Sequence, residues 1–514
     1  MYNSLFMNHA DPKDSSSSRF FPRFLRQVTP ILLVIAFVAI VYLFFPFRNR
    51  LQFDGDEGIN LMKASLVMKG YPLYEQIWSD QPPLLTYILV AVMRVFGTQV
   101  NTARVLILLF SIALLLAAFY ILRRIWGNLH ALVGTILIVL LPFYLQLSVS
   151  VMVGLPSMTF AVLSLLGVIA WHQDRKWIWL ALSALAFSAS VLIKLFTGFL
   201  IPIILVGLLL GEWGRLRGNL KLWDLVKPAM IWAGVFSLIT ISAIFIWVGP
   251  ANLIQLYQSH LVGAAIFNNQ RFTINHHLRD SLPILLLAIF GILFTIISRR
   301  WLTLYLVFWM GSAYLLLLRY APVWYHLQLL VTVPAAMLGG VAVGEGIGWA
   351  LDATRNRHLL RLRNLFAVLA LAAFVLVVYD QVPDVSRRLR YGANLADGPL
   401  QTSDFYLKVF QDVEQYAPET KWVVTDSPIF PYRLGLLVPP NLVVFSSKRF
   451  KTDLIAEEEV YKTIDAYRPE QVLIDKNIKG LKRYLDEDYT LVFTRKNLVL
   501  FIRNDVYFKH PDEP

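Results

Sequence analysis

Residues 30–47 read PILLVIAFVAIVYLFFPF and are followed directly by Arg48-Asn49-Arg50. A helix of this length crosses the roughly 30 Å of hydrocarbon in a bilayer. Three arginines precede the stretch, at positions 19, 23 and 26. The stretch is too long for the core of a signal peptide, and no small-residue cleavage site follows it. We therefore expect a first membrane span that the chain retains.

Similar apolar stretches recur as far as residue 379, and the composition agrees with them. The 514 residues are 57% hydrophobic and only 16% charged, whereas a soluble globular protein carries roughly 25% charged residues. The sequence therefore predicts a polytopic α-helical membrane protein. About eleven spans are expected, near residues 30–47, 104–122, 129–147, 155–171, 177–193, 198–211, 229–248, 281–297, 301–318, 328–344 and 364–379.

The net charge of +13 belongs to the membrane part of the chain. Residues 1–379 hold 28 Lys and Arg against 13 Asp and Glu, and residues 380–514 hold 19 against 21. Basic residues in short loops set the orientation of a membrane protein, so this excess does not indicate a nucleic-acid partner. The chain has no cysteine, which excludes disulfides, zinc–thiolate sites and thiol catalysis.

The distribution of basic residues predicts the topology. With the N-terminus in the cytoplasm, every short basic loop falls on the cytoplasmic side, as the positive-inside tendency requires. These loops contain Arg123-Arg124, Arg175-Lys176, Arg215 to Lys227, Arg299-Arg300 and Arg355 to Arg363. We expect a multi-pass protein of a bacterial inner or plasma membrane. Its parts are a cytoplasmic segment (1–28), a transmembrane domain (29–379) and a domain outside the membrane (380–514).

Two regions outside the membrane are expected to be ordered. The first external loop, 48–103, is long and polar, and its apolar stretch 84–96 is predicted to lie on the membrane surface rather than to span it. The tail is predicted to be a small α/β domain. Its expected elements are strands at 422–425, 442–445 and 471–474, a helix at 452–467, and a hairpin at 489–503 that turns near residues 496–497.

Carboxylates gather on the external side. Six of the 13 acids of the membrane part face outside near expected helix ends: Asp54, Asp56, Glu57, Glu75, Asp80 and Asp280. A carboxylate there acts as a general base, binds a divalent metal such as Mg²⁺ or Mn²⁺, or pairs with a cation. The alternative is a solvated loop whose acids lie at helix N-termini. Spacing alone leaves both interpretations open.

Cations and aromatic residues accompany these acids. Lys194 is a lone charge between two apolar stretches, which indicates either a functional site or a lysine that reaches the interface. His276 and Arg279 follow Arg271 in one external loop, where phosphate or sugar contact competes with plain surface exposure. Another loop contains Arg319, Tyr325 and His326. This set either holds an anionic lipid head group or sugar, or forms part of an aromatic belt.

The ordered motifs resemble those of the GT-C membrane glycosyltransferases, in the branch of protein O-mannosyltransferases and the lipid A aminoarabinose transferase. The resemblance rests on Asp56-Glu57 soon after the first span, on Ser79-Asp80-Gln81-Pro82-Pro83, on Phe96-Gly97 and on Arg104. It implies the GT-C fold with Asp56 as the catalytic aspartate and Asp80 as a second acidic position. By the same resemblance Lys194 and Tyr325 lie near the lipid phosphate. The aminoarabinose transferase has Lys where this chain has Gln81.

The resemblance and the residue inventory predict a glycosyltransferase. It would move a sugar from a polyprenyl-phosphate donor to a lipid, glycan or protein acceptor on the outer face, with inversion. Asp56, Asp80 and Glu57 are the expected catalytic residues. The expected phosphate- or substrate-binding residues are Lys194, Arg271, His276, Arg279, Arg319, Tyr325 and His326. A divalent metal at Asp56 and Asp80 stays open. Membrane lipids are expected partners, and nucleic acid is not.

Two other functions are alternatives. A flippase for lipid-linked sugars would carry polar residues within its spans and show internal repeats, whereas the polar residues here gather on one face. A structural or binding protein would use its tail to recognise a partner. The near-neutral tail neither supports nor excludes that role.

Overall fold

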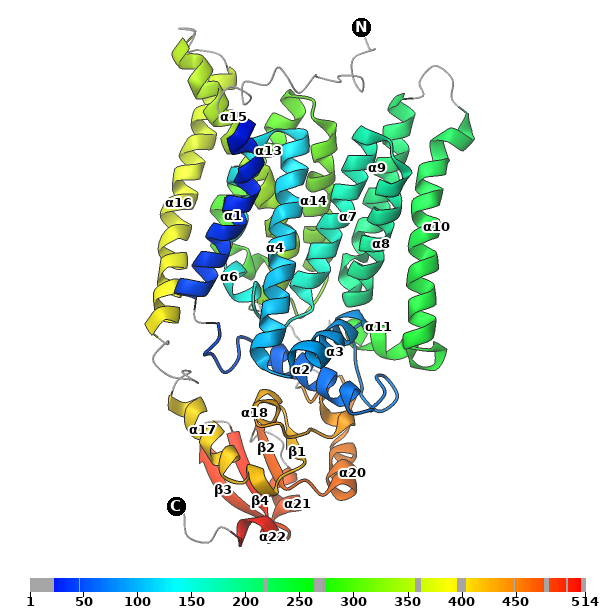
Figure 1. Cartoon of the computed structure of the whole chain (residues 1–514), viewed down its shortest axis with the longest axis vertical. Coiled ribbons are helices and arrows are strands. Elements are labelled where there is room, and N and C mark those ends of the chain that lie inside the picture. The colour runs from blue at the N-terminus through cyan, green and yellow to red at the C-terminus, as the bar shows by residue number, and fades with distance from the viewer. Residues whose placement is uncertain are drawn as a thin grey trace.

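The protein is a helical bundle with a small sheet domain beyond one end, as the computed structural model shows (Figure 1). The structure describes residues 23–45, 47–215, 221–262, 271, 273–355, 362–394, 404–446, 449–450, 452–475, 480–495 and 498–509. Most of the expected N-terminal segment 1–28 therefore lies outside the described residues. Within them, nine helices are long and apolar enough to span a membrane. This architecture confirms the predicted membrane fold.

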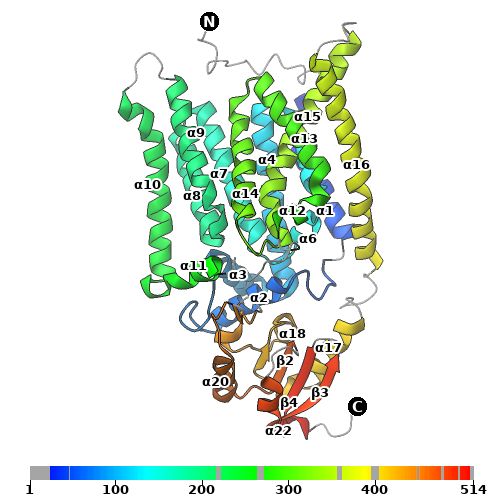
Figure 2. The ribbon, with the colours of Figure 1, turned by 180° about the vertical axis from the view of Figure 1, so that it is seen from behind.

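The long helices run side by side along the bundle (Figures 1 and 2). They are α1 (Arg23–Phe44), α4 (Val100–Ile125), α7 (Gly154–Asp174), α9 (Leu200–Arg215), α10 (Leu222–Trp247), α13 (Leu282–Ile297), α14 (Leu304–Leu318), α15 (Leu329–Arg355) and α16 (Leu362–Asn394). Two shorter apolar helices, α5 (Asn128–Val139) and α8 (Trp177–Ile193), lie among them. With these two, the bundle accounts for all the predicted spans.

The predicted span 129–147 is not one helix. It divides into α5 and the short α6 (Tyr144–Leu147). Pro142 stands in the break and has no N–H to continue the helical hydrogen bonds. Phe143 follows it with a left-handed φ of 63°, a conformation that a helix interior does not contain. The sequence prediction overlooked this proline.

The helix α15 forms the centre of the bundle, and its apolar span is wholly buried. Glycines allow its neighbours to approach it closely. A Cβ added to Gly291 of α13 would lie 2.0 Å from the carbonyl oxygen of Leu338 in α15. A Cβ added to Gly340 of α15 would lie 2.4 Å from the Cα of Gly134 in α5. Small residues at such contacts let helix backbones pack directly against each other in membranes.

The loops predicted to be cytoplasmic lie together at one end of the bundle. Arg124 pairs with Asp174 at 3.2 Å, and Glu212 pairs with both Arg175 and Arg215. The tail lies beyond the opposite end (Figure 1). The charged loops at this end and the tail are therefore separated by the length of the bundle. Assigning the basic end to the cytoplasm stays a prediction.

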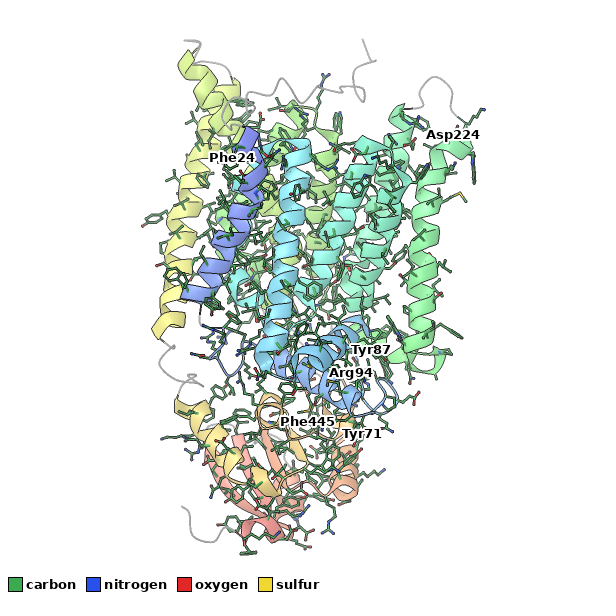
Figure 3. The ribbon with its side chains drawn as sticks, viewed as in Figure 1. Phe24, Tyr71, Tyr87, Arg94, Asp224 and Phe445 are labelled. Atoms are coloured by element: carbon green, nitrogen blue, oxygen red, sulfur yellow. The ribbon has the colours of Figure 1, made fainter. Side chains whose placement is uncertain are left out.

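The helices α2 (Gly55–Met68), α3 (Leu84–Phe96) and α11 (Leu253–Val262) lie between the bundle and the tail (Figures 1 and 2). The short α12 (Ile274–His277) precedes α13. Side chains from both parts meet in this region, where Tyr71 and Phe445 are marked in Figure 3. The ring of Tyr71 packs edge-on against Trp422 of the tail, with 6.1 Å between the ring centroids.

The tail contains a four-stranded sheet in the order β1-β2-β4-β3. The parallel pair is β1 (Val423–Thr425) and β2 (Gln471–Asp475), while β3 (Tyr489–Arg495) and β4 (Leu498–Arg503) form an antiparallel hairpin. The hairpin tip at 496–497 lies outside the described residues. The helices of the tail are α17 (Asp404–Gln415), α18 (Ile429–Arg433), α20 (Glu457–Tyr467), α21 (Leu481–Leu485) and α22 (Asn504–Tyr507).

Two predictions for the tail were wrong. Residues 442–445 form no strand, because Pro439 and Pro440 start a 3₁₀ turn that ends at Leu442. The helix expected from residue 452 begins at Glu457, with Ala456 as its N-cap. Three glutamates in its first turn interact favourably with the helix dipole. The apolar run 442–445 is buried all the same, which explains its strand-like appearance.

Replacement of Gly291 by alanine is expected to destabilise the bundle, because α13 and α15 must separate to admit the new Cβ. Gly311→Ala on α14 is the matched control, since a Cβ there meets nothing within 4 Å. The control should be neutral or slightly stabilising through helix propensity, by at most about 1 kcal/mol. Thermal unfolding in detergent measures both. Equal unfolding temperatures for the two variants would contradict the close packing of α13 on α15.

Candidate active site

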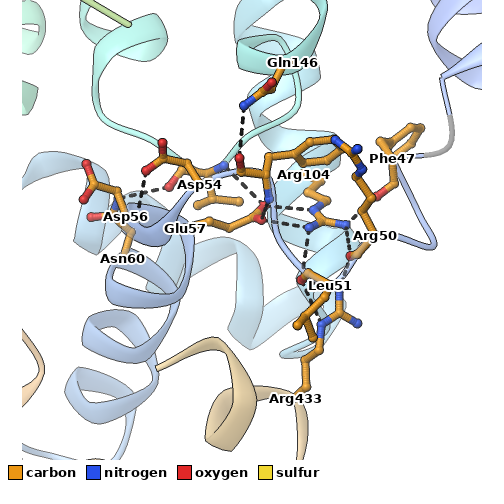
Figure 4. A network of polar contacts seen from close by, with 12 residues as sticks. Phe47, Arg50, Leu51, Asp54, Asp56, Glu57, Asn60, Arg104, Gln146 and Arg433 are labelled. Atoms are coloured by element: carbon orange, nitrogen blue, oxygen red, sulfur yellow. Dashed lines mark hydrogen bonds and ion pairs between the residues drawn. The ribbon is translucent and has the colours of Figure 1, made fainter. Parts of the chain in front are cut away.

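The N-terminus of α2 positions two of the predicted catalytic acids. Asp54 is the N-cap, with extended backbone angles, and its Oδ1 accepts a hydrogen bond from the backbone N–H of Asp56 at 3.0 Å. Asp56 and Glu57 then lie in the first turn, where the helix dipole favours negative charge. Successive residues of a helix point in different directions. Asp56 and Glu57 therefore face different surroundings (Figure 4).

Glu57 is fully enclosed and bonded on both oxygens. Arg104 of α4 donates from Nε to Oε1 and from Nη2 to Oε2, each at 2.8 Å. The backbone N–H of Phe53 also donates to Oε2, at 3.0 Å. Neither the Glu57 nor the Arg104 side chain is accessible to solvent. Glu57 was predicted to be catalytic, and that role stays a prediction for a carboxylate enclosed in this way.

Arg104 also holds the segment that leads from α1 into α2. Its Nη1 donates to the carbonyl oxygens of Phe47 and Arg50, the latter at 2.9 Å. Its Nη2 donates to the carbonyl of Leu51 at 3.4 Å. The guanidinium lies 4.7 Å from the ring centroid of Phe53. One buried side chain therefore fixes the path of the whole turn that precedes Asp56.

Asp56 lies in a crowded, charged environment at the start of α2. The residue is accessible to solvent, yet burial among the surrounding protein atoms is the largest cause that raises its pKa, to about 6. Water therefore reaches the carboxylate, although protein atoms surround much of it. The negative charges of Asp54 and Asp80 raise the pKa further, and the positive charges of Lys194 and Lys63 lower it.

Lys63 is a residue that the sequence prediction missed. It lies seven residues after Asp56 on α2, hence about two turns along the same helix face. The side chain is only 2% exposed, and its Nζ donates to Ser79 Oγ at 3.4 Å. Burial lowers its pKa, while the charges of Asp80 and Asp56 raise it. The seven-residue spacing was the available signal.

The N-terminus of α7 meets two of the predicted phosphate-binding residues. A Cβ added to Gly154, the first residue of α7, would lie 3.8 Å from His326 Cδ2 and 4.0 Å from Lys194 Nζ. Lys194 caps the end of α8 and is 7% exposed. A helix N-terminus carries partial positive charge. A lysine, a histidine and a helix N-terminus therefore converge, and the charge of this lysine acts on Asp56.

Tyr325 lies just before α15 and links this part of the chain to the N-cap of α2. Its hydroxyl donates to Asp54 Oδ2 at 2.9 Å and accepts from Gln146 Nε2 at 3.1 Å. Gln146 Nε2 also donates to the carbonyl of Phe53 at 3.0 Å. Both partners of Tyr325 therefore act on the turn that carries Asp56. Sequence reasoning had not singled out Gln146, which lies in an apolar stretch.

Asp80 lies where three parts of the chain meet. Its charge acts on Asp56 and Lys63 of α2, on Tyr320 before α15, and on Arg449 of the tail. Burial is the largest cause that lowers the pKa of Arg449, to about 10, against the opposing effect of Glu459 and Asp80. The Arg449 guanidinium also lies over the ring of Trp78, 4.3 Å from its centroid.

The other four predicted cations lie at the rim of this region. Arg271, His276, Arg279 and Arg319 are all exposed. His277, which the prediction left out, is half-buried, and one ring nitrogen lies 2.8 Å from the carbonyl oxygen of Val323. Tyr314 of α14 donates to Asn275 Oδ1 at 3.0 Å. The rim loops are thereby joined to one another, outside the cluster around Asp56.

A metal at Asp56 and Asp80 had been left open. Among the described residues, no three His, Asp or Glu side chains come together as a metal site. A divalent ion at a protein site takes several oxygen or nitrogen ligands.

Breaking the Arg104–Glu57 pair is expected to cost about 3–5 kcal/mol, because one buried charge loses its partner. Glu57→Gln tests this by thermal unfolding in detergent. Arg124→Ala is the matched control, because it breaks an ion pair whose side chains are 31% and 34% exposed and which should contribute about 0–1 kcal/mol. A Glu57→Gln variant as stable as the control would show that the buried pair is not essential to the fold.

Known proteins resemble this chain in part of its sequence and in its fold. A family model for dolichyl-phosphate-mannose-protein mannosyltransferases matches residues 80–247. No curated protein matches the chain. Among solved structures, ArnT from Cupriavidus metallidurans bound to undecaprenyl phosphate aligns with a TM-score of 0.60 at 15% identity, covering 92% of this chain and 97% of that one.

Two structures of an oligosaccharyltransferase from Archaeoglobus fulgidus are also similar. The apo form has a TM-score of 0.55 at 12% identity, covering 95% of this chain and 77% of that one. The complex of AglB with an inhibitory peptide and a dolichol-phosphate has a TM-score of 0.53 at 12% identity, covering 96% and 77%. At these identities the structures establish the fold. Together with the family match, they confirm the resemblance of this chain to GT-C membrane glycosyltransferases of the ArnT and protein-mannosyltransferase type.

Proposed function

We propose that the protein transfers a sugar from a polyprenyl-phosphate donor to an acceptor hydroxyl on the outer face of the membrane. One observation supports this most strongly. The charge of Lys194 acts on the carboxylate of Asp56, and Lys194 shares the N-terminus of α7 with His326. A base and a site for an anion are thus electrostatically coupled. Transfer from a sugar phosphate needs both groups.

Asp56 suits the role of general base. A base works best when its conjugate acid has a pKa near the working pH, and burial brings the pKa of Asp56 to about 6. The hydrogen bond from its own backbone N–H to Asp54 fixes the start of the helix that carries it. Asp56 takes the proton of the acceptor hydroxyl, and the hydroxyl oxygen attacks the anomeric carbon.

The leaving group is the lipid phosphate. The bond between the anomeric carbon and the phosphate oxygen breaks as the new glycosidic bond forms on the opposite face, so the configuration inverts. Negative charge develops on the departing phosphate, and cations placed in advance stabilise such charge. Lys194 supplies a cation there, and His326 and the N-terminus of α7 supply N–H donors. Arg271, His276, Arg279 and Arg319 lie at the rim, where they would receive the donor or acceptor.

The relatives favour the same donor class. One similar structure contains undecaprenyl phosphate, and another contains a dolichol-phosphate with an inhibitory peptide. Both lipids present a phosphate on a long polyprenyl chain. For this chain we propose that Asp80 orients the acceptor. We also propose that Tyr325 lies near the lipid phosphate while its hydroxyl holds Asp54. We further propose an inner or plasma membrane location with the tail outside.

Asp56→Asn is expected to abolish release of polyprenyl phosphate from a panel of polyprenyl-phosphate sugars, assayed in detergent with lipid, glycan and peptide acceptors. Asn keeps the size of the side chain but takes up no proton. Glu75→Gln is the matched control, because Glu75 is an exposed carboxylate of the same loop; it should leave turnover unchanged. Full activity of Asp56→Asn would reject this base. Movement of lipid-linked sugar across liposomes without turnover would favour the flippase.

The activity is expected to fall as the pH drops through about 6, since protonation of Asp56 removes the base. Lys63→Met should move this acid limb of kcat/KM to higher pH, because Lys63 lowers the pKa of Asp56. Lys69→Met on the same helix is the control, since Lys69 is exposed. An acid limb that stays in place or moves to lower pH in Lys63→Met would contradict the assignment of this limb to Asp56.

A further inference from the structure

The tail touches the backbone of the helix that carries Asp56. A Cβ added to Gly58, two residues after Asp56, would lie 2.6 Å from the backbone nitrogen of Ile429 in α18. Any larger residue at position 58 would therefore push the two helices apart. Tyr432 of α18 donates to the carbonyl of Thr98 at 2.6 Å, which ties the same short helix to the start of α4. The tail is thus docked on both sides of the Glu57–Arg104 pair.

Arg433, the last residue of α18, reaches beneath the turn before α2 (Figure 4). Its Nη2 donates to the carbonyl oxygen of Arg50 at 2.6 Å and to that of Leu51 at 2.9 Å. Its Nε also donates to Leu51, at 3.1 Å. Arg104 donates to these same two carbonyls from the membrane side. The turn is consequently clamped between one guanidinium of the bundle and one of the tail.

Two like charges this close need compensation. Burial and the charge of Arg104 lower the pKa of Arg433 to about 10, while Glu57 opposes this change. The carboxylate of Glu57 and the partial negative charge on the carbonyl oxygens of Arg50 and Leu51 supply this compensation. Such an arrangement depends on the fork of an arginine, since a lysine offers a point charge and cannot match two carbonyls in the same way. The clamp is therefore specific in geometry as well as in charge.

We infer that the C-terminal domain completes the active site, with Arg433 as a positioning residue that holds the turn at residues 50–57 and so sets the placement of Asp56. This rests on the proposed transferase function for its catalytic consequence. Arg433 touches no substrate. It acts through the backbone carbonyls of Arg50 and Leu51. Arg104, the partner of Glu57, binds the same two carbonyls. A small displacement of a catalytic base is sufficient to slow a reaction by about 100-fold.

Arg433→Gln and Arg433→Lys test the inference in the full-length protein. Arg503→Gln is the matched control, because Arg503 pairs with Glu470 and Asp505 inside the tail. Both Arg433 variants should lower kcat by about 10- to 100-fold and move the acid limb of the pH profile, with little change in KM for the donor. The control should lower the unfolding temperature without these changes. Equal kcat losses in the control would reduce Arg433 to a stabilising contact and overturn the inference.

A second measurement does not depend on catalysis. Hydrogen exchange of the backbone amides at residues 52–58 should accelerate at least 10-fold in Arg433→Gln relative to wild type and to Arg503→Gln, because the clamp on the turn is lost. Unchanged exchange would overturn the inference even if no substrate is turned over. If Arg433→Gln exchanges faster but the wild type shows no turnover, the clamp is supported and the proposed transferase function is rejected.

Discussion

The buried ion pair between Arg104 and Glu57 organises the region around Asp56. Neither side chain reaches solvent, so every hydrogen-bonding group of the pair must find its partner within the protein. Arg104 does so by binding the carbonyls of Phe47, Arg50 and Leu51. Glu57 does so through the N–H of Phe53. The requirement to satisfy two buried charges thereby dictates the backbone path into α2, and with it the direction in which Asp56 points.

The surrounding groups come from parts of the chain that are distant in sequence. Lys194 ends α8, His326 stands before α15, and both meet at the first residue of α7. The link from α7 back to α2 runs through Val151, whose carbonyl accepts from Asn60 at 2.9 Å. Apolar helices that pack through small residues bring these ends to one level. The polar site is therefore a product of how the helix ends align.

The sequence predicted the fold well and the site in part. Long apolar stretches are strong local signals, and they located the membrane-spanning helices. Asp54 before Gly55-Asp56-Glu57 is a recognisable helix start. The separate surroundings of Asp56 and Glu57 were not predictable, because they depend on Arg104 approaching one face of α2. Arg433 lay beyond prediction for a similar reason: its partners are backbone carbonyls, which leave no trace in the residue types at positions 50 and 51.

The contact of Arg433 with backbone carbonyls has an evolutionary consequence. A contact from a side chain to a carbonyl places no demand on the side chain of the residue that supplies the carbonyl. The residues at positions 50 and 51 are thus free to vary in polarity as far as this contact is concerned, whereas positions 104 and 433 must both keep a forked donor. The join between the membrane domain and the tail is held by two fixed arginines around a replaceable loop. A tail exchanged between relatives would need an arginine at the position of Arg433 to keep this contact.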